Sequence, residues 1–269
     1  MNKFLFSLIL CIYGNKSKYI NFLNSLKKQK FKNFELIIID QNKIQINKPK
    51  NLGFNIKILR SKPGLSLSRN LGIKYSKGKY IAFPDDDCTY LNDTLKVAFK
   101  NFSNNKADIV TGVTINKYKK KTLLKYPEKK KFYNKLDIVR SLNSISFFVK
   151  KKNIIFDKNL GLAGNRVLSG EETDYVLRYI KKFKSKVYFD PDLKIYHEEN
   201  KFNYKNKLDV GKIYFYAKGF KKTMFKNKLY IIFFIFLLKN ILDLILSLVF
   251  FNRKKLFKTY YSIKGKLSR

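Results

Sequence analysis

The 269-residue sequence contains no tryptophan, one histidine, two cysteines and only seven arginines. The two cysteines do not have metal-ligand spacing, which excludes a cysteine-based metal site and fits a reduced compartment. Lysine supplies almost all of the +39 net charge, and no RNA-binding or DNA-binding motif is present. Because phosphate recognition favours arginine, the sequence predicts no nucleic-acid partner.

Acidic residues are also scarce, and their distribution is informative. Only 19 are present, and ten of them lie in three short stretches, residues 85–87, 171–174 and 190–199. A composition that favours lysine should retain carboxylates mainly where they have a function. The clustering therefore predicts one site assembled from three parts of the chain, whereas solvated surface loops are the alternative interpretation.

Strands and helices alternate in the first part of the sequence. Residues 4–12 are a continuous apolar run of strand length, residues 34–39 have the composition of a second buried strand, and residues 18–28 repeat apolar side chains at helical spacing. This alternation predicts an α/β fold with a doubly wound sheet. Further along, residues 186–196 predict two short strands joined by a turn at residues 190–192.

Three consecutive carboxylates, Asp85, Asp86 and Asp87, directly follow an apolar strand predicted at residues 80–83. Adjacent like charges repel, so a compensating partner is expected. Carboxylates at the carboxyl end of a parallel strand lie where open α/β sheets bind ligands. A hard divalent cation suits such oxygens and can bridge to phosphates. The alternative is an acidic turn that caps the helix predicted from Leu91.

Two other polar residues adjoin predicted strands and helices. Asp40 follows the strand at residues 34–39, where its carboxylate can accept hydrogen bonds from a nucleoside or cap its own turn. Arg69 lies in the first turns of a helix that Ser66 or Ser68 can cap. A cation there is unfavourable for the helix dipole, so Arg69 is expected to have a specific carboxylate or phosphate partner. A snorkelling surface arginine is the alternative.

Residues 64–73, GLSLSRNLGI, and residues 78–88, GKYIAFPDDDC, resemble the central block of the family 2 glycosyltransferases, which have the GT-A fold. The pattern of that family runs G-x-x-x-A-R-N-x-G and then G-x-Y-I-x-F-L-D-D-D. Residues 35–40, ELIIID, are similar to the family's E-I-I-V-V-D segment. Two departures stand out, Pro84 in place of the usual leucine and Gln41-Asn42 in place of a small, glycine-containing turn.

Two later segments extend the resemblance. Residues 170–174, GEETD, are similar to the family's G-E-D-x-D segment, in which the second acid is the catalytic base. This implies Glu172 as the base, with Glu171 as the alternative, although acids also suit the first turn of a helix. The single histidine, His197, ends a segment similar to the family's Y-x-P-x-x-x-x-x-H and is expected to be a metal ligand rather than an ordinary surface or core histidine.

The resemblance implies a mixed sheet with helices on both faces and an inverting, metal-dependent hexosyltransferase that uses a nucleotide-diphosphate sugar. Mn²⁺ or Mg²⁺ would be held by Asp85, Asp87 and His197. The acceptor is expected to be a saccharide or a lipid-linked saccharide of an envelope polysaccharide. The alternatives are a GT-A-like binding protein that has lost catalysis and a sugar nucleotidyltransferase. The residues expected to bind the nucleotide sugar are Tyr13, Asp40, Arg69, Asp85 and Asp86.

The last part of the chain, residues 206–269, is predicted to be a basic helical tail that follows a glycosyltransferase domain of residues 1–205. Residues 229–251 are the most hydrophobic stretch of the sequence. As a helix they would extend about 34 Å, just sufficient to cross a bilayer. The tail therefore predicts attachment to a membrane.

Polar residues in that hydrophobic stretch lie on one stripe of the expected helix: Lys239, Asn240, Asp243 and Ser247. Basic residues flank both ends. These features predict peripheral, in-plane or re-entrant association at the cytoplasmic face of the inner or plasma membrane. A single membrane span and a soluble helical interface are the alternatives.

Overall fold

The computed structural model describes residues 3–14, 19–47, 49–162, 169–198, 203 and 205–268. The strands are β1 (Phe4–Ile12), β2 (Phe34–Asp40), β3 (Asn55–Arg60), β4 (Gly78–Ala82), β5 (Thr89–Tyr90), β6 (Ile109–Ile115), β7 (Lys131–Phe132), β8 (Phe147–Lys150) and β9 (Val187–Tyr196). The helices are α1 (Tyr19–Lys27), α2 (Leu65–Tyr75), α3 (Thr94–Asn105), α4 (Lys135–Ser141), α5 (Glu171–Phe183), α6 (Lys207–Lys226), α7 (Tyr230–Val249) and α8 (Arg253–Leu267).

The strands form one mixed sheet in the order β3-β2-β1-β4-β8-β6-β9-β5, and β7 adds to β9. β1 is parallel to β2 and β4, and β2 is parallel to β3. β8 lies antiparallel between β4 and β6, and β6 is parallel to β9. Every residue of β2 is buried, as is typical of a parallel strand covered on both faces, which explains why its sequence is apolar except for Glu35 and Asp40.

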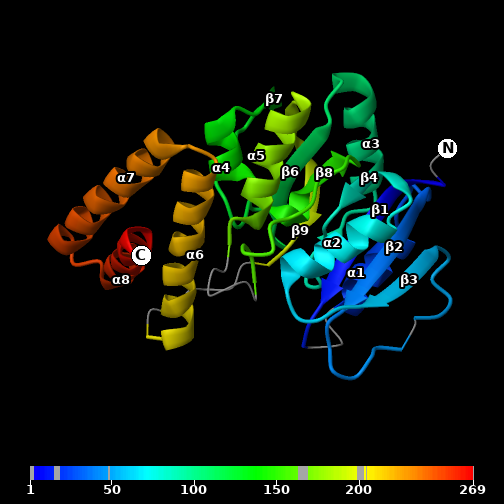
Figure 1. The fold of residues 1–269 in the computed structure, drawn as a ribbon, viewed down its shortest axis with the longest axis horizontal. Helices are drawn as coiled ribbons and strands as arrows, with labels where there is room; N and C mark the ends of the chain where they lie inside the picture. Colours follow the sequence, from blue (N-terminus) through cyan, green and yellow to red (C-terminus); the bar gives the residue numbers. More distant parts are fainter. Residues whose placement is uncertain are drawn as a thin grey trace.

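Helices cover both faces of the sheet (Figure 1). On one face, Phe22 of α1 and Phe102 of α3 belong to one buried cluster. On the other face, Ile73 of α2, Ile138 of α4 and Val176 of α5 belong to a second cluster. This arrangement confirms the predicted α/β fold and the mixed sheet with helices on both faces.

The predicted helix caps are wrong. α2 begins after Gly64 without a side-chain cap, and the Ser66 hydroxyl instead donates a 2.7 Å hydrogen bond to the carbonyl oxygen of Leu160. Ser68 likewise donates to Ser61 at 3.2 Å. The residue at the cap position of α3 is Asp93, so the Asp85–Asp87 run does not cap that helix.

The turn predicted at residues 190–192 is also wrong, because β9 runs through it as one bulged strand. The register between β6 and β9 shifts between Thr111 and Val113. At Gly112, between them, a Cβ atom would lie 1.9 Å from the carbonyl oxygen of Leu193. The bulge therefore depends on a glycine in the neighbouring strand, which the local sequence of β9 does not reveal.

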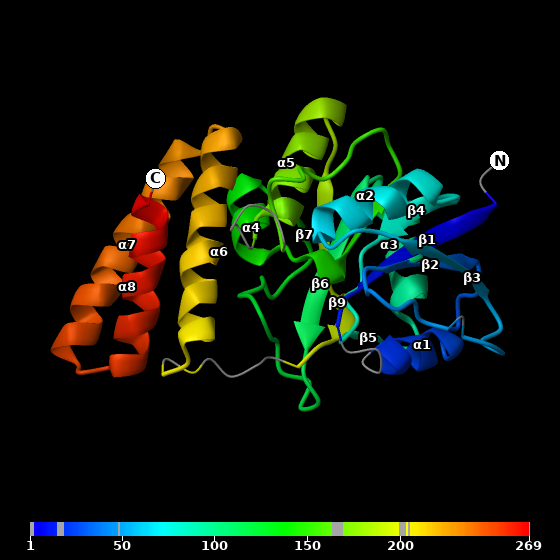
Figure 2. The same ribbon diagram turned by 60° about the horizontal axis from the view of Figure 1, so that its bottom comes forward.

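The tail consists of three helices, α6, α7 and α8, that lie side by side next to α4 and α5 (Figures 1 and 2). The helical character of the tail was predicted, but α8 as a separate helix after residues 229–251 was not. The polar stripe of α7 faces α8, since Asn240 is hydrogen-bonded to Ser262 at 2.6 Å and Asp243 pairs with Lys255 at 2.8 Å. The prediction that these polar residues form one stripe is therefore confirmed.

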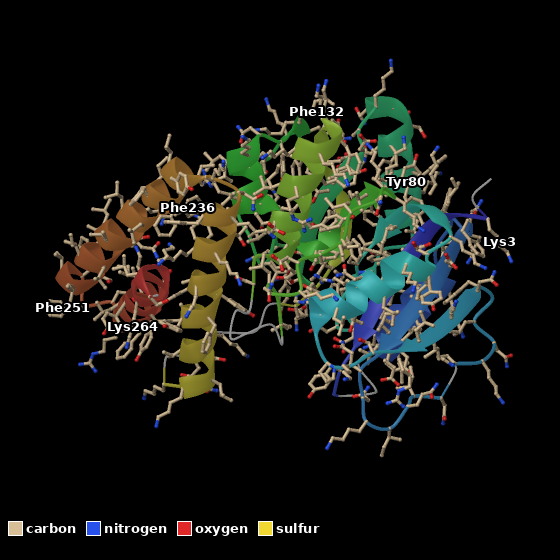
Figure 3. The ribbon with its side chains drawn as sticks, viewed as in Figure 1. Lys3, Tyr80, Phe132, Phe236, Phe251 and Lys264 are labelled. Carbon is tan, nitrogen blue, oxygen red and sulfur yellow. The ribbon has the colours of Figure 1, made fainter. Side chains whose placement is uncertain are left out.

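The outer face of α7 is apolar and exposed. Leu238 is 63% exposed, and Phe251, just after the helix, is 90% exposed. Figure 3 shows Phe251 and Lys264 at the outer side of the tail, away from the sheet. α7 is the one helix of the described residues that is long and apolar enough to cross a membrane. This face is consistent with association of the tail with a membrane.

Candidate active site

Three parallel strands, β1, β2 and β4, end at the same edge of the sheet. Tyr13 follows β1, Asp40 ends β2, and Pro84-Asp85 follows β4. The carboxyl edge of such a sheet is the usual ligand-binding edge of open α/β folds. The structure thus brings three of the predicted site residues to one edge.

Arg69 connects two of the acidic stretches. Its residue is only 1% exposed, and its guanidinium lies 3.2 Å from Glu171 Oε1 and 3.5 Å from Asp85 Oδ1. The guanidinium carbon is also 5.4 Å from the centre of the Phe156 ring. The expectation of a specific carboxylate partner for Arg69 is confirmed, and the snorkelling alternative is wrong. The guanidinium nitrogens face these carboxylates, and contact of Arg69 with a nucleotide stays a prediction.

Replacing Arg69 with methionine is expected to lower the free energy of unfolding by about 3–5 kcal/mol, since it leaves Glu171 buried without its cation. Chemical denaturation followed by circular dichroism measures the change. Arg253→Met, at an exposed arginine of α8, is the matched control and should stay within about 0.5 kcal/mol. Equal stability of the two variants would show that the ion pairs of Arg69 with Glu171 and Asp85 do not stabilise the site.

Hydrogen bonds with Asn70 hold the loop that begins at Phe156 and faces Glu171. The Asn70 side chain accepts a hydrogen bond from the Phe156 amide at 2.7 Å and donates one to the Phe156 carbonyl at 2.9 Å. Further along this loop, Gly161 has a φ of +89°, and a Cβ atom there would lie 3.0 Å from Glu171 Cδ. The sequence patterns did not assign either residue this role, because the partners are 86 and 10 positions away.

Glu171 and Glu172 begin α5 and have different environments. Oε1 of Glu171 is held by Arg69, whereas no ion pair holds Glu172 among the described residues, and Oε2 of each glutamate is buried without a hydrogen-bond partner there. Burial and the negative charge of Glu171 raise the pKa of Glu172 well above its ordinary value, although Arg69 opposes this. A carboxylate with a raised pKa and an uncommitted oxygen is suited to accept a proton.

Asp87 and His197 lie in contact, with Asp87 Oδ1 3.2 Å from His197 Nε2. Burial lowers the pKa of His197, but the hydrogen bond and charge of Asp87, together with the charges of Asp85 and Glu198, outweigh this effect, and the net change in the pKa is upward. Burial also raises the pKa of Asp85, against the effect of Arg69 and with that of Asp87. Asp86 occupies the turn between Asp85 and Asp87 and is partly buried.

The donor atoms at the Asp87–His197 contact have the chemistry that a divalent cation accepts. Carboxylate oxygens and an imidazole nitrogen are ligands for Mn²⁺, and Mg²⁺ prefers the oxygens. Nδ1 of His197 is buried and has no hydrogen-bond partner in the described part of the chain. Across the described residues, no group of three or more His, Cys, Asp or Glu side chains is arranged to hold a metal. The set Asp85, Asp87 and His197 therefore stays a prediction.

Within the described part of the third acidic stretch, residues 190–198, only His197 joins the site, and Glu199 lies outside the described residues. Asp190 accepts a 2.8 Å hydrogen bond from Asn101 and pairs with Lys130 at 3.3 Å, and Asp192 pairs with the same lysine at 2.8 Å. These contacts hold β9 to α3 and to the segment before β7. The prediction that all three acidic stretches form one site is therefore wrong for Asp190 and Asp192.

A cavity of about 680 Å³ opens next to the ends of β1, β2 and β3. Tyr13, Asn42 and Arg60 line it, whereas Asp40 does not. Both oxygens of Asp40 accept hydrogen bonds from its own loop, from Asn42 at 2.8 and 3.0 Å and from the Ile46 amide at 2.8 Å. Asp40 is thus seen in the turn-capping role that was the alternative, and it orders a wall of the cavity.

Gln41 and Asn42, the departures from the family pattern, tie the strand ends together. Asn42 Oδ1 accepts a 2.8 Å hydrogen bond from the Gly14 amide, and Gln41 Oε1 accepts one from the Gly64 amide at 2.7 Å. Arg60 donates to the carbonyl oxygen of Asn42 at 2.6 Å. These amide side chains replace a glycine-containing turn with hydrogen bonds that connect the ends of neighbouring strands.

The tail helix α6 is anchored on the first turn of α5. Asp174 is fully buried, and its carboxylate lies 3.0 Å from Lys226 and accepts a 3.0 Å hydrogen bond from Asn227. At Gly170, immediately before Glu171, φ is +90°, and a Cβ atom would lie 2.2 Å from Thr223 Oγ1. The position of the Glu171–Glu172 pair therefore depends on the end of α6.

The Gly170→Ala substitution is expected to destabilise the protein by about 1–3 kcal/mol, because alanine is strained at this φ and its methyl group displaces α6. It should also displace Glu172. Gly211→Ala, within α6 and with no atom within 4 Å of the new methyl group, should instead stabilise by about 0.5–1 kcal/mol. Thermal unfolding measured on both variants tests the contact between α6 and α5, which is refuted if Gly170→Ala behaves like Gly211→Ala.

Comparisons with known proteins agree with this geometry. A family model for glycosyl transferase family 2 matches residues 7–161. An uncharacterized glycosyltransferase of Haemophilus influenzae is 33% identical over 88 residues, which cover 32% of this chain and 30% of that protein. An uncharacterized glycosyltransferase of Methanocaldococcus jannaschii is 28% identical over 251 residues, covering 85% of this chain and 82% of that protein.

Two further relatives have more specific names. The UDP-Glc:alpha-D-GlcNAc-diphosphoundecaprenol beta-1,3-glucosyltransferase WfgD of Escherichia coli is 27% identical over 42% of this chain and 46% of its own length. The chain thus matches less than two thirds of the length of the Haemophilus and Escherichia proteins. A crystal structure of S. aureus TarS with UDP-GlcNAc has a TM-score of 0.60 at 14% identity and covers 97% of this chain and 90% of that one.

The likeness to TarS shows the fold alone, which is the GT-A fold. The family match includes the β1, β2 and β4 strand ends, Arg69 and the Asp85–Asp87 run. It covers more than half of the 269 residues, and the chain therefore belongs to glycosyl transferase family 2.

Proposed function

We propose that the protein transfers a sugar from a nucleotide-diphosphate sugar to an acceptor hydroxyl with inversion, as a hexosyltransferase. The observation that carries this proposal is the Arg69 bridge, which joins Asp85 at the end of β4 to Glu171 at the start of α5. It brings the expected diphosphate end of the donor site next to a buried carboxylate pair.

Glu172 is the general base in this proposal. Its buried Oε2 accepts the proton of the acceptor hydroxyl while that oxygen attacks the anomeric carbon, and the bond from this carbon to the diphosphate breaks. The nucleoside diphosphate leaves with the electron pair of the broken bond. Glu171 is bound to Arg69 and fixes the start of α5, so we assign the base to Glu172 and a positioning role to Glu171 and Arg69.

The donor occupies the cavity lined by Tyr13, Asn42 and Arg60, with its diphosphate directed at Asp85, Asp86 and Asp87. Asp87 and His197, together with Asp85, would hold the divalent cation. When bound, this cation offsets the charge that develops on the leaving diphosphate. Arg69 keeps Asp85 in place from the buried side.

The acceptor is proposed to be a lipid-linked saccharide used in envelope glycan synthesis. The E. coli relative is named for such an acceptor, and the exposed apolar face of α7 suits an enzyme that works at a membrane. We propose that residues 1–205 form the glycosyltransferase domain and residues 206–269 a peripheral or re-entrant attachment at the cytoplasmic face. Polar contacts between the α7 stripe and α8 favour this over a single span.

Replacing Ile231, Leu238 and Leu242 with serine is expected to release the protein from membranes, because these side chains are 79%, 63% and 57% exposed on α7. Losing about 100 Å² or more of buried apolar area per residue weakens binding by several kcal/mol in total. Sedimentation with phospholipid vesicles measures this. The matched control replaces exposed Tyr118, Ile44 and Ile155 with serine, all outside the tail. Equal vesicle binding by both triple variants would refute the attachment face.

The proposed activity is tested by incubating the protein with Mn²⁺, a lipid-linked saccharide and a panel of nucleotide sugars, starting with UDP-linked ones. Acceptor-dependent release of a nucleoside diphosphate with one donor is the expected result. Metal-dependent donor binding without transfer to any acceptor would instead support the catalytically inactive alternative.

A further inference from the structure

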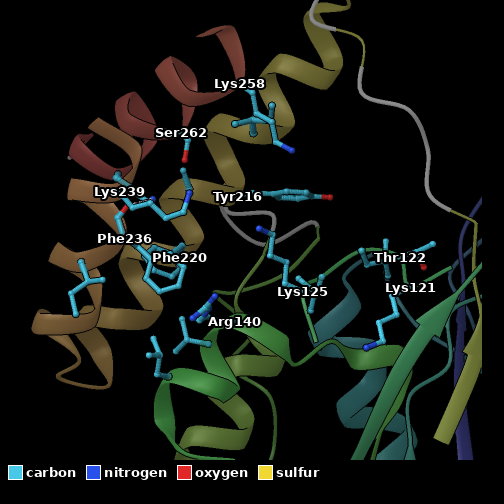
Figure 4. A pocket seen from close by; sticks show the side chains of 18 residues that line it. Lys121, Thr122, Lys125, Arg140, Tyr216, Phe220, Phe236, Lys239, Lys258 and Ser262 are labelled. Carbon is cyan, nitrogen blue, oxygen red and sulfur yellow. Dashed lines mark hydrogen bonds between the residues drawn. The ribbon is translucent and has the colours of Figure 1, made fainter. Parts of the chain in front are cut away.

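A second cavity, of about 780 Å³, lies between the glycosyltransferase domain and the tail (Figure 4). One wall is the segment 121–125 with α4, and the other is formed by α6, α7 and α8. Phe220 and Phe236 provide apolar surface on the tail side. In Figure 4, Lys125 and Arg140 face Lys258 and Tyr216 across this space.

The lining is strongly positive. It includes six lysine or arginine residues and no aspartate or glutamate among the described residues. Lys121 and Lys239 are neutralised by Glu128 and Asp243, but no carboxylate in the described part of the chain pairs with Lys125, Arg140 or Lys258. A set of unpaired cations beside apolar side chains matches the chemistry of an anionic lipid head group.

Lys266 is a further cation of this wall, and it is unusually buried. Its residue is 5% exposed, and its amino group contacts the Phe236 carbonyl at 3.3 Å and lies 5.1 Å from the centre of the Phe220 ring. Burial, with a smaller effect of Lys239, lowers the pKa of Lys266 to about 8. A buried lysine without a carboxylate partner is costly unless an anion compensates it.

The cavity borders the active site on two sides. The Ser169 hydroxyl, two positions before Glu171, donates a 3.0 Å hydrogen bond to the carbonyl oxygen of Tyr216, which lines the cavity. On the other side, the Thr122 hydroxyl in the cavity wall donates to the carbonyl oxygen of His197 at 3.1 Å. A molecule held in the cavity therefore lies next to both α5, which carries Glu172, and the Asp87–His197 contact.

We propose that this cavity binds the phosphate or diphosphate group of a lipid-linked acceptor, with the lipid chain against Phe220, Phe236 and the apolar face of α7. The saccharide of that acceptor then extends past Tyr216 towards Glu172. This inference rests on the proposed function and names the part of the chain that selects its acceptor.

The test measures binding of farnesyl diphosphate, inorganic diphosphate and farnesol by calorimetry, without nucleotide sugar. The parent protein should bind farnesyl diphosphate more tightly than either of the other probes. Lys125→Gln/Lys258→Gln removes one cation from each wall and should weaken farnesyl diphosphate binding roughly tenfold or more. The control Lys207→Gln/Lys264→Gln removes two exposed tail lysines outside the cavity and should bind like the parent. Arg140→Gln, a second variant at an exposed position, should weaken binding in the same direction.

Three results would overturn the proposal. One is unchanged farnesyl diphosphate binding in Lys125→Gln/Lys258→Gln, and another is inorganic diphosphate binding as tightly as the lipid probe. The third concerns phosphatidylglycerol vesicles. If both double variants lose vesicle binding equally, and neither loses farnesyl diphosphate binding, the lysines form a general membrane-binding surface. Binding of farnesyl diphosphate by Glu172→Gln separates this result from the proposed activity, because that variant lacks only the base.

Discussion

Replacing Glu172 with glutamine is expected to lower kcat by about 10²–10⁴-fold, because glutamine cannot accept the proton of the acceptor hydroxyl. The KM for the nucleotide sugar should change little, since Glu172 lies at the start of α5 and does not line the cavity next to β1, β2 and β3. Steady-state rates with saturating donor and acceptor measure the effect. Glu128→Gln, at a glutamate whose side chain is 84% exposed, is the control with parental activity.

The pH profile gives a second measure of the same role. Burial and the charge of Glu171 raise the pKa of Glu172, so the base becomes protonated, and inactive, at a pH above that of an ordinary glutamate. In the parent protein kcat should therefore fall as the pH drops through this raised pKa. The corresponding limb should be absent in Glu172→Gln. Full turnover by the variant would mean that another group removes the proton.

Asp87→Asn is expected to lower activity by about 10²–10³-fold at a fixed Mn²⁺ concentration, because it removes a charged metal ligand and weakens stabilisation of the leaving diphosphate. A titration of activity against Mn²⁺ should show a midpoint at higher metal concentration. Asp192→Asn, at an aspartate whose side chain is 63% exposed and which pairs with Lys130, is the control. Identical Mn²⁺ titrations for Asp87→Asn and the parent would remove Asp87 from the metal site.

The sheet was largely predictable because its strands carry their own signal. β1 and β2 are mostly apolar, as is typical of parallel strands buried on both faces. β9 was harder, since its Asp190-Pro191-Asp192 sequence has the composition of a turn. Only the neighbouring glycine, Gly112, makes room for a bulge there, and strand pairing is not visible in local sequence.

The site was predictable as a set of motifs but not as a set of contacts. Motif order indicated Asp85, Glu171 and Glu172, whereas the Arg69 bridge between them spans 102 positions and emerges only in the folded chain. Asp40 illustrates the opposite case, since its position at a strand end fits both a ligand contact and a turn, and the observed hydrogen bonds come from its own loop.

The contact between α6 and α5, the helix that carries Glu172, was not predictable. Asp174 matched a family pattern, but its partners Lys226 and Asn227 lie in a tail whose lysine-rich composition gives no specific signal. α8 was missed for the same reason. Both features matter for function, because together they place the apolar face of α7 and the cationic cavity beside the active site.

The central claim is that Glu172 acts as the base of an inverting transfer, and the anomeric configuration of the product tests it most directly. With an α-linked nucleotide sugar as donor, nuclear magnetic resonance of the product should show a β-glycosidic bond, and its formation should depend on Glu172. An α-linked product, formed equally well by Glu172→Gln, would contradict the account.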